Sequence, residues 1–391
     1  MIVLFWIGVA WLGYVYVGYP VILALLALAR RVRPAARNDF LPGVSVLIAA
    51  RNEEKDIGWK VTETLQWDYP PEQLEILVAS DASDDHTDEI VRMIKDPRVT
   101  LIRMEKRGGK GRALNQLVQH ARADLLFFTD ANAHIAPNCL RQMVRHFGDP
   151  RVGCVTGSTS TVREADNRAI GSGAAVYLGY ESLVGRLESQ LGAVLVCDGA
   201  IFCIRRSLYK PVSPELANDL ELPLHVAHAG YWTLYEPQAR VLERDTQSPG
   251  EEFARRRRIS GQGALAMWKL RAMLFGLRGW QFLSHKLLRY LTVVPLLLLL
   301  IATVGLSRRP FFAACLLAQI LFYGSAMYVY VLTLRGRGAG RLLSVPFYVL
   351  FGSLGALVGL MDTCRGRRFD IWEIPSLSRG RDSEILGKAG L

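Results

Sequence analysis

Residues 125–132 read LLFFTDAN, a run of four apolar residues followed by Thr129, Asp130, Ala131 and Asn132. A short apolar run of this kind predicts a buried β-strand that ends at the acid. In open α/β sheets, ligands bind at the carboxyl ends of the strands. Asp130 and Asn132 are two residues apart, so both can face one ion, and their oxygens suit a hard divalent cation bound together with phosphate. An acid after a strand is also common in a plain turn or helix cap, so this interpretation depends on the rest of the chain.

Strands and helices alternate before this stretch. Apolar runs at residues 44–50, 74–79 and 99–103 predict strands, and residues 57–66, 87–95 and 112–121 predict helices. The alternation favours a parallel α/β sheet. Polar clusters recur at residues 51–54, 80–85 and 129–132, each directly after a predicted strand. This is the layout expected of a nucleotide-binding crevice.

The two ends of the chain are apolar. Residues 2–29 contain no charged side chain, which is long enough to cross a bilayer, and no basic residue precedes them. They therefore predict a retained anchor rather than a secretory signal. Stretches at about residues 291–306, 311–334 and 342–361 bring the expectation to about four transmembrane helices. Residues 263–286 mix aromatic and basic side chains, which predicts a helix in the membrane interface, with a soluble surface helix as the alternative.

The formal net charge of +11 is concentrated beside the apolar segments, as at Arg30, Arg31 and residues 255–258. The positive-inside rule then places the large polar domain in the cytoplasm, at the inner face of a multi-pass cell-membrane protein. A membrane surface and an anionic phosphate substrate explain the charge better than nucleic acid, which we do not expect as a partner. Four spans would put both termini outside, whereas the arginines of the tail favour the inside, so the side of the tail stays open.

Several other kinds of site are not indicated. The six cysteines show no C-x-x-C spacing, and scattered reduced thiols fit a cytoplasmic domain. His225 and His228 are three residues apart, but no third zinc ligand is evident. Lys110 does not stand in a Walker motif, because Gly111 follows it where Ser or Thr is needed. No G-x-S-x-G nucleophile motif occurs, and no G-x-G-x-x-G follows a strand, which argues against a hydrolase and a dinucleotide oxidoreductase.

Taken in order, these motifs resemble those of the membrane-integrated family 2 glycosyltransferases, which include hyaluronan, cellulose, chitin-oligosaccharide and poly-N-acetylglucosamine synthases. The resemblance covers nearly the whole chain. It implies an α/β GT-A fold, a nucleotide-diphosphate sugar donor such as a UDP-sugar, a Mg²⁺ or Mn²⁺ cofactor and inversion at the anomeric carbon. It also implies an anchor at residues 1–30, a GT-A domain at 38–262, an interfacial helix at 263–286, transmembrane helices at 287–364 and a basic tail at 365–391.

The resemblance assigns the nucleotide sugar to residues at the strand ends. The family's first-strand motif, which lines the base and ribose, matches Ala49, Ala50, Arg51, Asn52 and Glu53, with a turn and helix cap as the alternative. Asp81 matches the acid that contacts uracil or ribose. Lys110, in GGKGRALN, matches the basic residue beside the diphosphate, and Asn115 serves the same loop.

The remaining matches concern the metal, the acceptor and the catalytic base. Asp130 and Asn132 match the family's DxD motif, with an amide in place of the second acid. Asp198 and Gly199 match the acceptor-side loop, or a structural turn. Asp219, in the sequence NDLE, matches the general base, and Glu221 is the runner-up.

Arg258 matches the arginine of the family's QxxRW motif, which grips the diphosphate. Arg255 replaces the glutamine of that motif and Ile259 the tryptophan, which puts processive synthesis in doubt. A plain juxtamembrane charge cluster is the alternative.

The implied function is metal-dependent transfer of a hexose to a glycan acceptor in polysaccharide biosynthesis, with Asp219 removing the proton of the acceptor hydroxyl. Two alternatives remain open. One is transfer of a single sugar to a lipid-linked or lipid acceptor among the membrane lipids. The other is a catalytically silent protein that binds nucleotide and serves as a scaffold for the proteins of an export complex.

Overall fold

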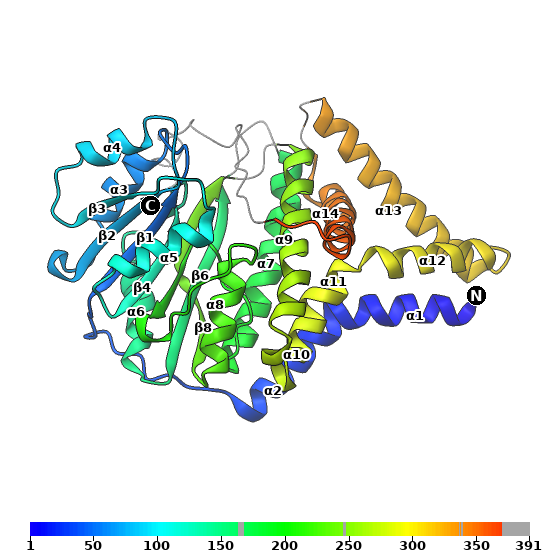
Figure 1. Ribbon diagram of the computed structural model, residues 1–391. Helices are drawn as coiled ribbons and strands as arrows, with labels where there is room; N and C mark the ends of the chain where they lie inside the picture. Colours follow the sequence, from blue (N-terminus) through cyan, green and yellow to red (C-terminus); the bar gives the residue numbers. More distant parts are fainter. Residues whose placement is uncertain (163–167, 245–247, 336, 338, 370–391) are drawn as a thin grey trace. The chain divides into compact units, whose positions relative to one another are not determined.

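The computed structural model describes residues 1–162, 168–244, 248–335, 337 and 339–369. The chain divides into two compact units (Figure 1). We call the unit built from Ala29–Val162 and Val184–Arg244 the α/β unit, and the unit built from Met1–Leu28, Arg163–Leu183 and Asp245–Arg368 the helical unit. Residues 168–183 and 248–262 thus belong to the helical unit, although they fall within the expected domain of residues 38–262. Nearly all of the basic tail lies outside the described residues.

The described residues of the α/β unit form an eight-stranded mixed sheet in the order β3-β2-β1-β4-β7-β6-β8-β5. The strands are β1 Val44–Ala50, β2 Leu74–Ser80, β3 Val99–Arg103, β4 Leu125–Asp130, β5 His134–Ile135, β6 Val152–Val162, β7 Phe202–Arg205 and β8 Trp232–Arg244. Strands β1 to β4 run parallel, as the sequence predicts, and β7 is antiparallel to β4. The strand order reverses between β1 and β4, which is where open α/β sheets place their ligands.

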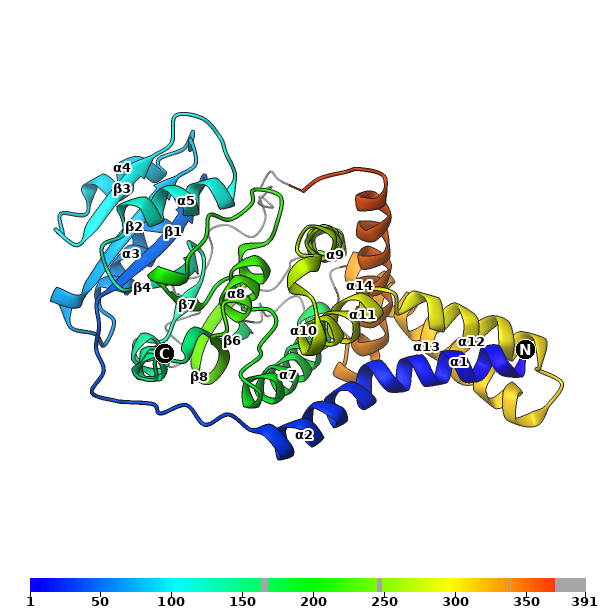
Figure 2. The ribbon, with the colours of Figure 1, turned by 60° about the horizontal axis from the view of Figure 1, so that its bottom comes forward.

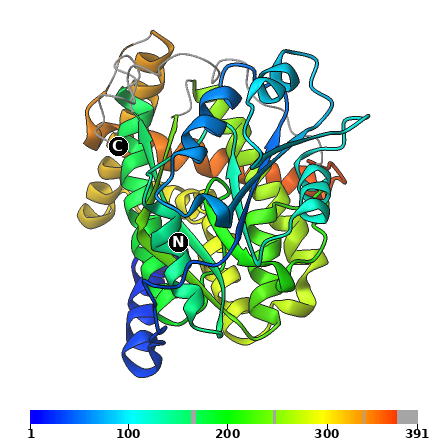
Figure 3. The same ribbon diagram turned by 90° about the vertical axis from the view of Figure 1, so that its left-hand side faces the viewer.

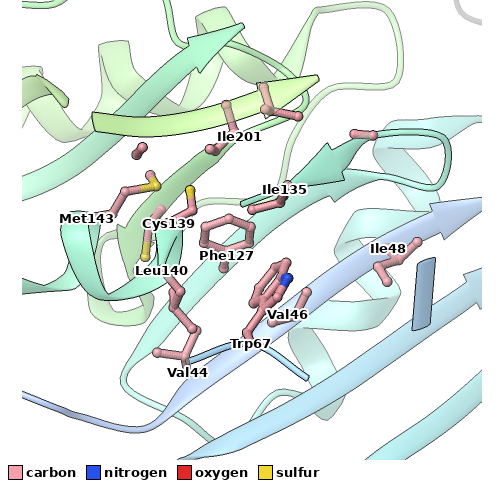
Figure 4. Close-up of a cluster of buried hydrophobic side chains, with 14 of the residues drawn as sticks. Val44, Val46, Ile48, Trp67, Phe127, Ile135, Cys139, Leu140, Met143 and Ile201 are labelled. Atoms are coloured by element: carbon pink, nitrogen blue, oxygen red, sulfur yellow. The ribbon is translucent and has the colours of Figure 1, made fainter. Parts of the chain in front are cut away.

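Helices cover both faces of this sheet, which Figures 1, 2 and 3 show from three directions. One face packs against α3 Ile57–Leu65, α4 Thr87–Met93 and α6 Cys139–Val144, and the other against α5 Lys110–His120 and α8 Asn218–His228. Successive residues of β1 point to opposite faces, so Val46 and Ile48 join the first cluster and Leu47 and Ala49 the second. Figure 4 shows the first cluster, with Phe127 of β4 beside Trp67.

The helical unit contains the apolar segments. Its helices are α1 Ile2–Gly13, α2 Tyr19–Arg30, α7 Arg168–Gln190, which continues into the α/β unit, α9 Pro249–Lys269, α10 Gly276–Gln281, α11 Leu288–Tyr290, α12 Val293–Gly305, α13 Pro310–Leu334 and α14 Arg341–Cys364. Three helices, Ile2–Arg30, Pro310–Leu334 and Leu342–Cys364, are long and apolar enough to cross a membrane. The pair Gly276–Tyr290 and Val293–Gly305, bent by 57°, makes a fourth if it counts as one span. The described residues therefore hold three or four candidate spans.

The helix predicted at residues 263–286 is broken into pieces. Helix α9 ends at Lys269, a 3₁₀ turn occupies Arg271–Met273, and α10 begins at Gly276, whose φ is +60°. A left-handed residue cannot continue a right-handed helix, and glycine adopts this conformation at little cost. The aromatic and basic pattern of this stretch therefore belongs to several short helical segments.

Helix α14 packs closely against α9 along a stripe of glycines. A Cβ atom on Gly359 would lie 2.1 Å from the carbonyl oxygen of Arg257 and 2.2 Å from Ser260 Oγ, and one on Gly355 would lie 3.0 Å from the carbonyl oxygen of Phe253. Small residues allow helix backbones to approach in this way. The stripe therefore sets the distance between these two helices.

Candidate functional site

The ends of three adjacent strands lie level at the edge where the strand order reverses. Ala49 of β1 is in register with Ala79 of β2 on one side and with Asp130 of β4 on the other. Glu53, just beyond β1, is buried, and its backbone N–H donates to Thr87 Oγ1 over 2.8 Å. The first-strand motif and Asp130 are therefore neighbours at one edge of the sheet.

The loop after β1 holds the loop after β2. Arg51 Nη1 donates to the carbonyl oxygens of Asp81 and Ala82, both over 2.7 Å. Asn52 has a φ of +52°, and its Oδ1 accepts from the N–H of Asp84 over 3.1 Å. Asparagine tolerates the left-handed conformation better than most residues. The two polar clusters thus form one connected structure.

Asp81 connects the same structure to the glycine-rich loop. Its buried carboxylate accepts hydrogen bonds from the N–H groups of Gly108, over 2.6 Å, and Gly109, over 2.9 Å. Gly109 has a φ of +81°, and α5 begins at the next residue, Lys110. The oxygens of Asp81 therefore anchor the loop that carries Lys110. The contact of Asp81 with uracil or ribose stays a prediction.

Lys110 and Asp130 form an ion pair. Lys110 Nζ lies 2.5 Å from Asp130 Oδ1, and both side chains are about a quarter exposed, with 23% of each accessible. Lys110 is predicted to bind the diphosphate, and Asp130 is the first acid of the predicted metal motif. The two residues are 20 apart in the sequence and meet at the carboxyl end of β4. A hydrogen bond between two charged groups is among the stronger polar contacts in proteins.

The turn after Asp130 carries oxygen donors of the kind that a hard cation needs. Asn132 stands two residues on, and the N–H of Ala133 donates to the carbonyl oxygen of Asp130 over 3.3 Å, which closes the turn. Within the described residues, no group of three or more His, Cys, Asp or Glu side chains is arranged to hold a metal ion. One carboxylate and one amide fit a Mg²⁺ or Mn²⁺ ion that completes its shell with water and phosphate rather than with a full protein cage.

The sheet register places the acceptor-side loop beside Asp130. Strand β7 is antiparallel to β4, with Phe202 opposite Phe128. Because the two strands are antiparallel, the loop that leads into β7 lies at the carboxyl end of β4, where Asp130 is. The N–H of Ala200 donates to Asp198 Oδ1 over 3.0 Å, so the loop that holds Asp198 is tightly turned.

Asp219 lies against this loop. A Cβ atom on Gly199 would be 3.2 Å from Asp219 Oδ2, and the carbonyl oxygen of Asp219 accepts from the N–H of Cys197 over 2.8 Å. Burial raises the pKa of the Cys197 thiol, with a smaller contribution from the nearby Asp219 carboxylate. Asp219 therefore contacts the loop that leads into β7, the strand that pairs with β4.

Glu221, the alternative base, is engaged in holding a loop. Its Oε2 accepts from the N–H of Ser213 over 2.8 Å, and its Oε1 accepts from Ser213 Oγ over 2.9 Å. The same loop packs on α5, because a Cβ atom on Gly111 would lie 3.3 Å from the carbonyl oxygen of Ser213. Asn115, expected to serve the loop of Lys110, instead binds Val212 through both its amide atoms. Glu221 therefore holds the loop of residues 212–213, and the choice of Asp219 as the base stays a prediction.

Lys60 is a residue near the site that the sequence motifs do not mark. Its side chain on α3 is fully buried, and its Nζ donates to the carbonyl oxygen of Ala133 over 2.6 Å. Burial lowers the pKa of Lys60 to about 8, although the carboxylates of Glu63 and Asp130 act in the opposite direction. The sequence does contain a signal, because Lys60 shares a helical face with Ile57 and Val61, which are buried.

Arg258 lies on α9, in the helical unit. Its neighbours Arg256 and Arg257 form ion pairs within that unit, Arg256 with Glu252 at 2.7 Å and Arg257 with Asp362. The basic block is therefore partly a packing element of the helical unit. The role of Arg258 toward a diphosphate stays a prediction.

Comparison with known proteins agrees with this geometry. Residues 45–212 match the model of Glycosyl transferase family 2, a range that runs from β1 through Asp198 and Gly199. These residues form a family 2 glycosyltransferase domain. Asp219 lies a few residues beyond the matched range of this domain.

Two curated relatives are similar to part of this chain. The poly-beta-1,6-N-acetyl-D-glucosamine synthase of Staphylococcus aureus (strain COL) is 27% identical over 216 residues, which are 53% of this chain and 51% of that protein. The beta-monoglucosyldiacylglycerol synthase of Synechocystis sp. (strain ATCC 27184 / PCC 6803 / Kazusa) is 31% identical over 130 residues, 32% of this chain and 27% of that protein. The chain thus spans about half the length, or less, of the curated relatives it matches.

A solved structure has the same fold. The mannosyltransferase PcManGT from Pyrobaculum calidifontis, in complex with GDP-Man and Mn²⁺, superposes with a TM-score of 0.67 at 21% identity and covers 90% of this chain and 99% of its own. The glycosyltransferase domain therefore has the GT-A fold that the motifs imply.

Proposed function

We propose that this protein is an inverting glycosyltransferase of the cell membrane. It moves a hexose from a nucleotide-diphosphate sugar, a UDP-sugar, to a glycan acceptor at the cytoplasmic face, in the synthesis of a polysaccharide. The observation that carries this proposal is the arrangement at one sheet edge of the Lys110–Asp130 ion pair and, beside the loop of residues 197–201, the Asp219 carboxylate. The family match supports the reaction class.

In this proposal the chain supplies a base and fixed positive charge. Asp219 removes the proton of the acceptor hydroxyl as that oxygen attacks the anomeric carbon, because a sugar hydroxyl is a weak nucleophile until its proton is taken. Lys110 binds the diphosphate, on which negative charge develops as the bond to the sugar breaks. Charge that is already in place where new charge develops is usually the largest catalytic contribution.

A divalent cation fits the same site. Asp130 and Asn132 would hold Mg²⁺ or Mn²⁺ together with the donor phosphates, and such an ion neutralises the charge of a leaving diphosphate. The similarly folded mannosyltransferase was solved with Mn²⁺ and GDP-Man, which supports this choice. The amide at residue 132 adds no negative charge, so we expect the affinity for free metal to be low.

The proposal is tested with the full-length protein in detergent or nanodiscs, a panel of nucleotide sugars, and Mg²⁺ or Mn²⁺. We expect one UDP-sugar to give sugar-containing products by mass spectrometry, with release of UDP. Asp219→Asn should reduce turnover by about 10²- to 10⁴-fold, the usual contribution of a general base, while donor binding persists.

Glu221→Gln is the matched comparison, because both acids lie in the first turn of α8. It should lower the thermal midpoint and retain turnover. If Glu221→Gln abolishes turnover while Asp219→Asn retains it, the assignment of the base is wrong. A wild-type protein that binds nucleotide sugar and releases no UDP with any donor would favour a non-catalytic scaffold.

A second candidate is transfer of one sugar to a lipid acceptor. The similarity to a beta-monoglucosyldiacylglycerol synthase supports it, and so does the departure from QxxRW at Arg255 and Ile259. The same assay separates the two candidates by product length. A ladder of masses indicates a glycan polymer, whereas a single glycolipid mass indicates a lipid acceptor.

A further inference from the structure

Lys60 is a buried cation whose hydrogen bond goes to a backbone carbonyl at the exit of the proposed metal turn. Its Nζ lies 2.6 Å from the carbonyl oxygen of Ala133, the residue that follows Asn132. The Trp67 ring lies on another side of the ammonium, with its centroid 5.7 Å from Nζ. The side chain has no exposed surface. Removing an ammonium from water carries a large desolvation penalty.

Two other side chains of α3 hold the same segment. The Trp59 ring stacks on the His134 ring, with centroids 3.6 Å apart and planes 6° from parallel. Glu63 Oε1 lies 3.4 Å from His134 Nδ1, and Glu63 Oε2 accepts from the N–H of Ile135 over 3.4 Å. Side chains of α3 therefore contact three successive residues, 133 to 135, which follow Asn132 directly.

The two ends of the turn are fixed by different means. At its start, Asp130 continues the parallel β1–β4 ladder and pairs with Lys110. At its exit, Lys60 holds the carbonyl of Ala133, whose N–H closes the turn on Asp130. An apolar side chain would fill the space beneath the turn without the cost of burying a charge, but it would offer no donor to this carbonyl. The buried Lys60 ammonium thus donates to a backbone carbonyl of the turn itself.

We propose that Lys60 is a positioning residue for the metal site: by fixing the Ala133 carbonyl, it holds the turn of residues 130–133 so that the Asp130 and Asn132 oxygens face one cation. Trp59 and Glu63 support the same turn through their contacts with His134 and Ile135, the next two residues along the chain. The inference rests on the proposed function, because it takes Asp130 and Asn132 as the ligands of the ion that accompanies the donor diphosphate.

The test compares Lys60→Met with wild type and with Lys55→Met, an exposed lysine just before α3. Methionine keeps the length of the side chain and removes the charge and the donor. Mn²⁺ binding in the presence of UDP is followed by the loss of the free-ion EPR signal, and UDP binding in EDTA by calorimetry. We expect Lys60→Met to weaken Mn²⁺ binding about tenfold or more, to leave metal-free UDP binding within about twofold, and Lys55→Met to match wild type.

Equal losses of Mn²⁺ and metal-free UDP binding in Lys60→Met would indicate a general packing defect and overturn the positioning role, as would unchanged Mn²⁺ binding. If Lys60→Met does not fold, Glu63→Gln takes its place, and it must weaken Mn²⁺ binding without weakening metal-free UDP binding. Wild-type protein that binds neither UDP nor Mn²⁺ would overturn the proposed function, and the role of Lys60 with it. A defect confined to the Lys60 or Glu63 variants leaves the proposed function intact.

Discussion

Gly199 is a residue whose missing side chain matters to its neighbour. An added Cβ atom would lie 3.2 Å from Asp219 Oδ2, which is closer than ordinary van der Waals contact. Gly199 is not among the glycines with positive φ, so its backbone accepts an alanine without strain. A substitution here therefore moves the proposed base by a few tenths of an ångström and leaves the loop of residues 197–201 in place.

At this scale we predict that Gly199→Ala lowers kcat about tenfold, because misplacement of a reacting group by a fraction of an ångström is costly in catalysis. The KM for the nucleotide sugar and the thermal midpoint should change little. Steady-state kinetics measure kcat and KM, and a thermal melt measures the midpoint. Gly13→Ala, at a glycine with no atom within 4 Å of the added Cβ, serves as the control. An unchanged kcat would argue against Asp219 as the base.

At the scale of elements, helix α14 depends on its glycines for contact with α9. The stripe of Gly352, Gly355 and Gly359 faces α9, and the approach is closest at Gly359. The Arg257–Asp362 ion pair ties the same two helices beside that point. Close backbone packing of this kind stabilises a helix pair through van der Waals contact.

We predict that Gly359→Leu separates α9 from α14 and lowers the thermal midpoint of the detergent-purified protein by several degrees or more, since the side chain would meet the Arg257 backbone. Gly324→Leu on α13 is the matched control, because no atom lies within 4 Å of a Cβ there. A fluorescence-monitored melt measures the difference. Equal midpoints for the two variants would show that α14 does not need its close approach to α9.

At the scale of the whole molecule, the number of membrane spans decides on which sides the termini lie. Three helices qualify as spans individually, and the bent pair Gly276–Tyr290 and Val293–Gly305 adds a fourth if it crosses the membrane. Four spans put the two termini on the same side, whereas three put them on opposite sides. Arg365, Arg367 and Arg368 after α14 favour the cytoplasmic side for that end.

With four spans and a cytoplasmic glycosyltransferase domain, we predict that both ends of the chain are external, so that the number of spans outweighs the arginines after α14. Cys364 is exposed at the end of α14, and Val3→Cys places a second thiol near the start of α1. A membrane-impermeant maleimide should label both thiols in sealed right-side-out vesicles. Labelling of Val3→Cys with protection of Cys364 until detergent is added would mean that the bent pair does not cross.

The sequence predicts much of the fold because its signals are local. The apolar runs of β1, β2, β3 and β4 and the helices between them follow from periodicity and turn chemistry over a few residues. The sequence does not predict the break in the helix beyond α9, because the basic and aromatic pattern of residues 263–286 is typical of one continuous helix. The break includes Gly276, whose φ of +60° is incompatible with a right-handed helix. A single glycine in a helical pattern is usually tolerated, so its effect there was set by the surrounding structure.

The candidate site, like the fold, is only partly predictable from the sequence. The motifs name Asp130, Lys110 and Asp219, and the fold brings Lys110 to 2.5 Å from Asp130. They do not name Lys60, because a lysine on the buried face of a helix shows no partner in its own segment. Its acceptor, the Ala133 carbonyl, lies 73 residues further along the chain. Likewise Glu221 resembles a base in sequence, while its contact with Ser213 appears only once the loop is folded back.

The sequence by itself determined the strands β1 to β4, the helices between them and the apolar segments, and it showed which acidic, amide and basic side chains stand at the ends of these strands. It did so because burial periodicity and helix capping act between near neighbours. Only the tertiary structure decided that β7 lies antiparallel beside β4, with Phe202 opposite Phe128, so that the loop before β7 carries Gly199 against Asp219. That pairing depends on packing both faces of one sheet, and the free energy of such packing is shared among residues far apart in the chain.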